Sequence, residues 1–81
     1  MILPTKRIPE DRSLLAVGAD VLHVLEEPQT VSKVWDELRL IRGSRYNGSP
    51  LSFDWFTLAL AMLFTISAIT LDNGRLRRVH P

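Results

Sequence analysis

Cysteine is absent from the 81-residue sequence. Disulfides, catalytic thiolates and zinc sites built on thiolates are therefore excluded, and the composition suits a reducing compartment. The first residues also lack the basic region, apolar segment and small-residue cleavage site of a secretory signal. From these two absences we expect the protein to be cytoplasmic.

An excess of one charge is also missing, because 10 lysines and arginines stand against 9 acidic residues. No field of one sign steers the whole molecule toward nucleic acid or an anionic membrane, so any such binding has to be local. The chain length allows one small domain, which buries only about 60% of the surface that its unfolded form exposes. Spare apolar surface is therefore expected to need a partner.

Residue types that form enzyme sites are present but not grouped. His23 and His80 are far apart in the sequence and are expected at the surface. No serine lies in a nucleophile elbow, and no glycine-rich loop precedes a helix with a lysine placed for phosphate. The sequence predicts no catalytic residue, no metal site and no cofactor, and we do not expect an enzyme.

Residues 1–10 contain two prolines and are predicted to be an extended N-terminal arm, followed by a single domain over residues 11–81. The first helix of that domain is predicted from Asp11 or Arg12 to about Glu27, where a proline follows. Its apolar stripe consists of Leu14, Val17, Gly18, Val21, Leu22 and Leu25. The glycine in this stripe predicts the close approach of another helix.

A second helix is predicted to begin after a cap at Thr30 or Ser32. Its apolar stripe consists of Val31, Val34, Trp35, Leu38 and Ile41, and the tryptophan is expected in the core. Glycines, serines, an asparagine and a proline then predict a flexible loop over residues 42–50, with Arg45 and Tyr46 at its tip.

The longest uncharged run covers 17 residues, Trp55–Leu71. A membrane span needs about 20 predominantly apolar residues, and this run contains four hydroxyl residues and ends in a turn signal. Three interpretations are open: a membrane span, which these features disfavour, a helix buried at the centre of the domain, and a core helix that also presents a second apolar face to a protein partner. We favour the last, because aromatic and methionine side chains are common anchors of protein interfaces.

A helical wheel supports two apolar faces in this region. The helix is predicted to follow a Ser52 cap, with Asp54 near the positive end of its dipole. One face, assigned to the core, holds Phe53, Phe56, Leu60, Leu63 and Phe64. The nearly opposite face, assigned to a partner, holds Trp55, Leu58, Met62 and Ile66.

The final segment changes to a strand period around Asn73-Gly74, the strongest short-range signal for a hairpin. Ile69, Leu71 and Leu76 are expected to face inward. Three helices followed by a hairpin predict a mostly α, α+β fold, the small winged-helix domain, with the hairpin as its wing.

Major-groove recognition by the third helix is not expected, since residues 53–67 contain no arginine, lysine, asparagine or glutamine. A local basic cluster lies instead on the predicted wing, at Arg75, Arg77 and Arg78. Three roles are open for it: a solvated strand edge that discourages aggregation, a phosphate or DNA contact, and an ion pair with a partner protein. A stand-alone DNA-binding regulator that uses these arginines is the alternative function.

Several segments together resemble the small middle component of bacterial ABC-three-component systems, over almost the whole chain. They are the opening Met1-Ile2-Leu3-Pro4-Thr5-Lys6-Arg7-Ile8, Ser13-Leu14-Leu15, Thr30-Val31-Ser32-Lys33-Val34-Trp35, Phe53-Asp54-Trp55-Phe56, Leu58-Ala59-Leu60 and Ala68-Ile69. The resemblance implies a winged-helix subunit that partners a large SMC/Rad50-like coiled-coil ATPase and an effector, often a nuclease. Lamassu-type anti-phage and anti-plasmid defence belongs to this group.

By this resemblance the chain is expected to be a non-enzymatic adaptor that bridges ATPase and effector and helps control the effector. DNA contact is expected only within the complex, and no membrane contact is expected. The residues expected to contact partners are Ile2, Leu3, Pro4 and Lys6 in the arm, and Trp55, Leu58, Met62 and Ile66 on the third helix.

Overall fold

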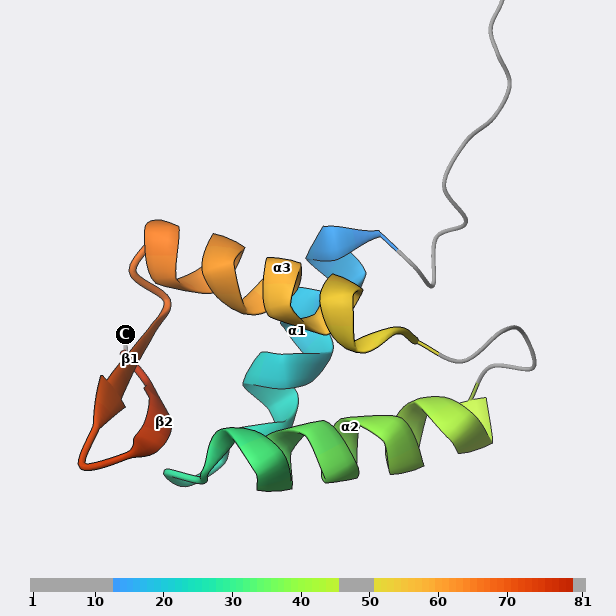
Figure 1. Cartoon of the computed structure of the whole chain (residues 1–81), viewed down its shortest axis with the longest axis horizontal. Helices are drawn as coiled ribbons and strands as arrows, with labels where there is room; N and C mark the ends of the chain where they lie inside the picture. The colour runs from blue at the N-terminus through green and yellow to red at the C-terminus, as the bar shows by residue number, and fades with distance from the viewer. Residues whose placement is uncertain (1–12, 46–50, 80–81) are drawn as a thin grey trace, which may run out of the picture.

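The computed structural model describes residues 13–45 and 51–79 of the chain. Three helices are followed by a two-stranded antiparallel hairpin (Figure 1). The elements are α1 (Leu14–Val24), α2 (Val31–Arg45), α3 (Phe53–Thr65), β1 (Ile69–Asp72) and β2 (Arg75–Arg78). The mostly helical α+β fold is thus confirmed, and its element order is consistent with a winged-helix-like arrangement. The predicted arm over residues 1–10 lies outside the described residues.

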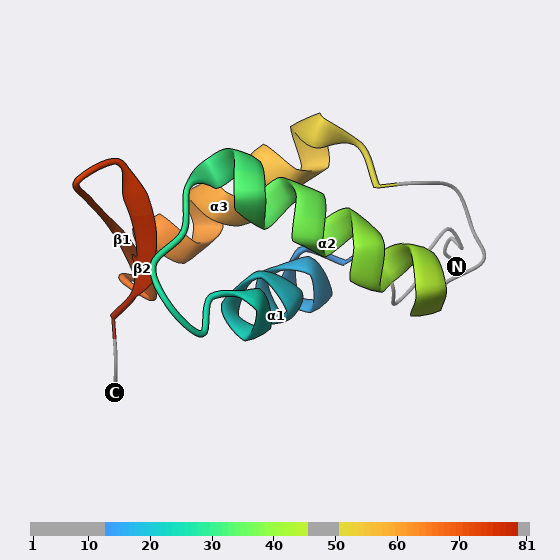
Figure 2. The ribbon, with the colours of Figure 1, turned by 90° about the horizontal axis from the view of Figure 1, so that it is seen from below.

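Helix α1 begins later and ends earlier than its apolar pattern predicts. Ser13 is the N-cap, and its hydroxyl accepts the Ala16 N–H at 3.0 Å. The helix ends at Val24 rather than Glu27, because the chain beyond it pairs with the hairpin. Gln29 and Leu76 exchange backbone hydrogen bonds of 3.1 and 2.7 Å. Figure 2 shows this connection beside the hairpin.

Helix α2 begins as predicted, with the Thr30 hydroxyl accepting the Lys33 N–H at 3.2 Å. It then continues through Gly43 to Arg45, so the loop predicted from residue 42 was wrong in its first four residues. Arg42 explains the extension, because its guanidinium is buried against α1 and holds the last turns of α2 in place. Tyr46 lies outside the described residues.

Helix α3 follows the predicted Ser52 cap, whose hydroxyl accepts the Trp55 N–H at 3.1 Å. Its buried residues are Phe56, Ala59, Leu60 and Leu63. The assignment of Phe53 and Phe64 to the core was wrong, since they are 50% and 42% exposed. The side of α3 that carries Phe56, Ala59 and Leu63 packs against α1. The rings of Phe53 and Phe64 therefore lie at the edge of this contact.

The hairpin has the predicted Asn73-Gly74 turn, with φ angles of 58° and 79°. Leu71 pairs with Leu76 across the strands, yet Leu76 is 1% exposed and Leu71 is 56% exposed. The prediction that Leu71 faces inward was therefore wrong. Strand β2 lies between β1 and Gln29 and is covered by the core, whereas Leu71 lies on the outer strand.

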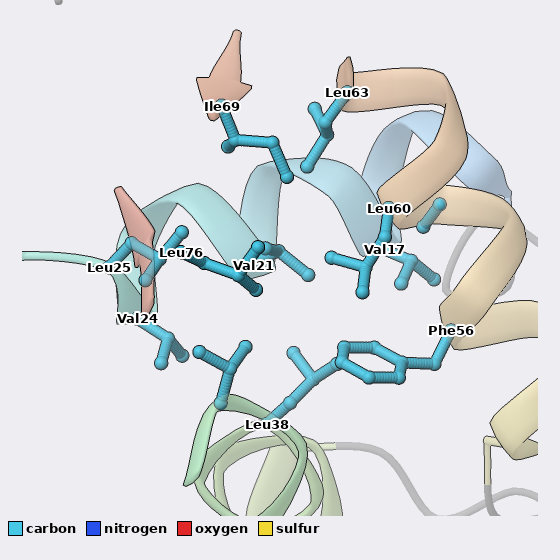
Figure 3. Close-up of a cluster of buried hydrophobic side chains, with 12 residues drawn as sticks. Val17, Val21, Val24, Leu25, Leu38, Phe56, Leu60, Leu63, Ile69 and Leu76 are labelled. Carbon is cyan, nitrogen blue, oxygen red and sulfur yellow. The ribbon is translucent and has the colours of Figure 1, made fainter. Parts of the chain in front are cut away.

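The hydrophobic core draws on all three helices and both strands (Figure 3). Side chains from α1 lie at its centre, between those of α2 and α3. The fully buried members with the largest volumes are Phe56, Leu25, Leu38, Leu76, Val17, Val21 and Val34. Trp35 is half-buried and packs against this core, with its ring centroid 4.9 Å from that of Phe56. The structure thus places Trp35 at the edge of the core rather than within it.

Gly18 marks the closest approach between α1 and α3, as the sequence predicts. A Cβ atom at this position would lie 2.9 Å from Met62 Cε and 3.3 Å from Leu63 Cδ2. We therefore expect Gly18→Val to lower the free energy of unfolding by about 2 kcal/mol through overpacking. Urea denaturation followed by circular dichroism measures this change.

Gly43 provides the matched control for this prediction. It is also helical, but a Cβ there would meet nothing within 4 Å. Gly43→Val is expected to change the free energy of unfolding by less than about 0.5 kcal/mol, since only helix propensity differs. Equal losses for the two variants would mean that valine acts through propensity alone, and would contradict the close approach at Gly18.

Candidate protein-binding surface

The predicted partner-facing residues of α3 do not form one exposed face. Leu58 and Ile66 are 49% and 61% exposed, whereas Trp55 and Met62 are half-buried and pack against the core. The orientation of α3 that exposes Phe53 and Phe64 also turns the side chains of Trp55 and Met62 toward the core. The predicted arm contacts, Ile2, Leu3, Pro4 and Lys6, lie outside the described residues.

A different strip of α3 faces away from the core. We name it the α3 surface, and its exposed residues are Phe53, Asp54, Thr57, Leu58, Ala61, Phe64 and Thr65. Its one charge is Asp54 on the first turn, although the solvent side of an amphipathic helix normally carries several charges. From Thr57 to the end of the helix the surface is uncharged.

The threonines do not make the α3 surface polar. The Thr57 hydroxyl donates to the Asp54 carbonyl, and the Thr65 hydroxyl donates to the Ala61 carbonyl, both at 2.8 Å. These hydroxyls are thus satisfied by the helix itself, a pattern common for threonine inside helices. The surface therefore offers mainly methyl groups and the apolar side chains of Leu58 and Phe64.

Aromatic packing holds the N-terminal end of the α3 surface against α2. The Phe53 ring meets the Trp35 ring edge-on, with centroids 5.2 Å apart, and lies 5.6 Å from the Phe56 ring. The Arg39 guanidinium lies 5.2 Å from the centroid of the Trp35 ring. This cluster fixes the position of Phe53 while leaving half of it exposed.

The three wing arginines are not brought to one face. Arg75 and Arg77 project from the same side of β2, and Arg77 Nε lies 3.7 Å from Asp72 Oδ2. Arg78 projects from the other side, where its Nη1 donates to the Leu22 carbonyl at 3.2 Å. Two of the three side chains thus have partners within the domain, which fits a solvated hairpin better than a row of phosphate contacts.

A buried ion pair between α1 and α2 was not predicted from the sequence. Arg42 Nη1 lies 2.5 Å from Asp20 Oδ2, and both side chains are about nine-tenths buried. A signal was present: Asp20 falls three residues after Val17 and four before Val24, within the buried side of α1. Arg42 likewise follows Leu38 by one helical turn, so each charge lies on a face that packs inward.

Residues 13–45 and 51–79 contain no helix that is long and apolar enough to cross a bilayer. The same ranges contain no group of three or more histidine, aspartate and glutamate side chains placed to hold a metal ion.

Comparison with known families covers nearly the whole chain. The family model described as "ABC-three component (ABC-3C) system Middle Component 6" matches residues 3–80, which include all three helices and the hairpin. Neither the curated proteins nor the solved structures contain a match to the chain.

Proposed function

We propose, from the premise that this chain belongs to the Middle Component 6 family of ABC-three-component (ABC-3C) systems, that it is an adaptor subunit without catalytic activity of its own. Membership in this family makes it one component of a multi-subunit system and implies partnership with the other ABC-3C components. The adaptor joins two of these components and controls one of them.

In this proposal the adaptor bridges a coiled-coil ATPase of the SMC kind and an effector nuclease, in the cytoplasm. It helps to hold the effector inactive until foreign DNA is sensed, as in defence of the Lamassu type against phages and plasmids. ATP hydrolysis and DNA cleavage belong to the partners. DNA contact by the chain takes place only within the complex.

The apolar α3 surface, with Asp54 as its one charge, is the observation that supports this proposal. It exposes about half of Leu58 and slightly less of Phe64. Covering such half-exposed side chains gains about 1 kcal/mol each. Ile66 and Leu71 are further exposed apolar residues after the end of the helix, at 61% and 56% exposure. An area of this kind suits docking onto another protein.

Co-purification tests the α3 surface as the docking site. The chain is co-expressed with the proteins encoded beside it, and Leu58→Glu or Phe64→Glu is introduced. We expect each variant to recover its partner at least about tenfold less well, because a carboxylate would be buried against apolar groups. Circular dichroism of each variant checks that the helices remain folded.

Leu15→Glu is the matched control, since Leu15 is 75% exposed on α1 and lies outside the α3 surface. Its recovery of the partner is expected to equal that of the wild type. Full recovery by folded Leu58→Glu and Phe64→Glu variants would refute docking through this surface.

A further inference from the structure

A second surface lies on the other side of the domain, between the end of α1 and the middle of α2. It is an open groove with a volume of about 410 Å³. Figure 1 shows α2 and α3 on opposite sides of α1, with this junction on the α2 side. The lining residues that matter here are Glu26, Glu27, Gln29, Glu37, Leu40 and Ile41.

The lining of the groove has more acidic than basic groups. Three carboxylates and His23 line it, and Arg77 and Arg78 line a neighbouring pocket that Glu26 and Glu27 also border. Among the described residues Glu26 and Glu27 form no ion pair, and Glu37 has only an exposed contact of 3.7 Å with Lys33. Such an exposed pair contributes little and leaves the carboxylate available. The groove therefore carries a negative potential in a molecule whose net charge is only +1.

The groove also has apolar lining residues. Leu40 is 73% exposed at its edge, and Ile41 packs between the groove and the core. A free cation gains nothing from leucine, and the described carboxylates are not grouped closely enough to hold a metal ion. A lining that combines apolar and acidic side chains is complementary to a peptide that carries both apolar and basic side chains.

Gln29 adds an unused hydrogen-bond acceptor at this groove. Its Nε2 donates to the Val24 carbonyl at 3.2 Å, while its buried Oε1 has no hydrogen-bond partner among the described residues. Buried polar atoms are normally paired, so this oxygen is an exception among the described residues.

We propose that this groove binds a basic amphipathic segment of a protein partner, with its apolar side chains on Leu40 and its lysines or arginines against Glu26, Glu27 and Glu37. The charge complementarity and the apolar lining residues select this occupant. The groove is separate from the α3 surface, so the domain has two docking sites of different chemistry. One takes an uncharged apolar surface, and the other takes a basic segment.

Fluorescence anisotropy with a synthetic probe tests the groove. The probe is a fluorescein-labelled helical peptide with leucines on one face and lysines on both flanks, and its counterpart has glutamate in place of lysine. The full-length chain is expected to bind the lysine peptide saturably and the glutamate peptide at least about tenfold more weakly. Binding of the lysine peptide is expected to weaken as salt rises.

Variants locate the bound peptide. Glu26→Lys combined with Glu27→Lys is expected to weaken binding about tenfold, and Leu40→Ser is expected to weaken it several-fold. The matched control combines Asp36→Lys with Asp54→Lys, which changes the net charge equally at two exposed positions outside the groove. This control is expected to keep at least half of the wild-type affinity.

Four results would overturn the groove proposal. They are the absence of saturable binding, equal losses in the two charge-reversed double variants, loss of binding in Leu58→Glu, and self-association of the chain that Glu26→Lys abolishes. The third would place the peptide on the α3 surface, and the fourth would make a second copy of this chain the occupant. None of these experiments uses the ATPase or the effector, so their outcome is independent of the adaptor proposal.

Discussion

Asp20→Ala is expected to lower the free energy of unfolding by about 3 kcal/mol. The substitution leaves the Arg42 guanidinium nine-tenths buried without the carboxylate that lies 2.5 Å from it. Removing one member of a buried ion pair is far more costly than removing both, because the remaining charge stays out of water. Urea denaturation at neutral pH, followed by circular dichroism, measures the loss.

Asp36→Ala is the matched control for this experiment. Asp36 also pairs with an arginine, at 2.9 Å from Arg39, but both side chains are more than half exposed. Exposed pairs contribute between about 0 and 1 kcal/mol, so this variant is expected to unfold almost as the wild type does. The difference between the two aspartates isolates the effect of burial from that of the ion pair itself.

A double variant separates charge from packing. Asp20→Leu combined with Arg42→Met replaces the buried pair with apolar side chains and is expected to recover most of the lost stability. If Asp20→Ala unfolds at the same urea concentration as Asp36→Ala, the ion pair does not join α1 to α2 as described. The extension of α2 past Gly43 would then need another explanation.

Local signals in the sequence were enough to predict the elements of this fold. Ser52 and Thr30 carry the capping hydroxyls predicted for two helices, and Asn73-Gly74 forms the predicted hairpin turn. The Ser13 cap of α1 was not predicted. Each signal acts within about four residues, so it is legible without knowledge of the rest of the chain. The element order, and with it the fold class, followed from these signals.

Contacts between distant segments were not predictable in this way. The Asp20–Arg42 pair joins residues 22 positions apart. The Gln29–Leu76 bridge joins the connection between α1 and α2 to strand β2. The bridge shortens α1 and buries Leu76 while Leu71 stays exposed. Helical periodicity cannot show such events, because it reports how residues repeat along one element and not which neighbour that element meets.

Helical periodicity likewise did not show which residues of α3 form the exposed surface. The wheel separates two apolar faces of α3, but it does not state which face the rest of the domain covers. Packing against α1 covers the arc from Met62 to Leu60, and this choice exposes Phe64 while drawing Trp55 inward. Of the predicted partner-facing residues on this helix, Leu58 alone belongs to the strip that the structure leaves uncovered.

Phe56→Ala is expected to lower the free energy of unfolding by about 4 kcal/mol, close to the whole stability of a small domain. Its ring is 0% exposed and packs 4.9 Å from the Trp35 ring, centroid to centroid. The substitution opens a cavity between α1, α2 and α3 that the backbone can fill only in part. Thermal and urea denaturation are both suitable measurements, since the variant is expected to be partly unfolded at 37 °C.

Phe64→Ala distinguishes the helical-wheel assignment of Phe64 to the core from its exposed position in the structure. The wheel assigns Phe56 and Phe64 to one buried face and predicts similar losses for both. The structure leaves Phe64 42% exposed, so its replacement is expected to change stability by about 1 kcal/mol. In the recovery of the partner, Phe64→Ala is expected to have the larger direct effect of the two. Phe64 belongs to the α3 surface, so its loss is expected to weaken partner recovery in an otherwise folded chain. A loss of stability as large as that of Phe56→Ala would return Phe64 to the core and remove it from the docking surface.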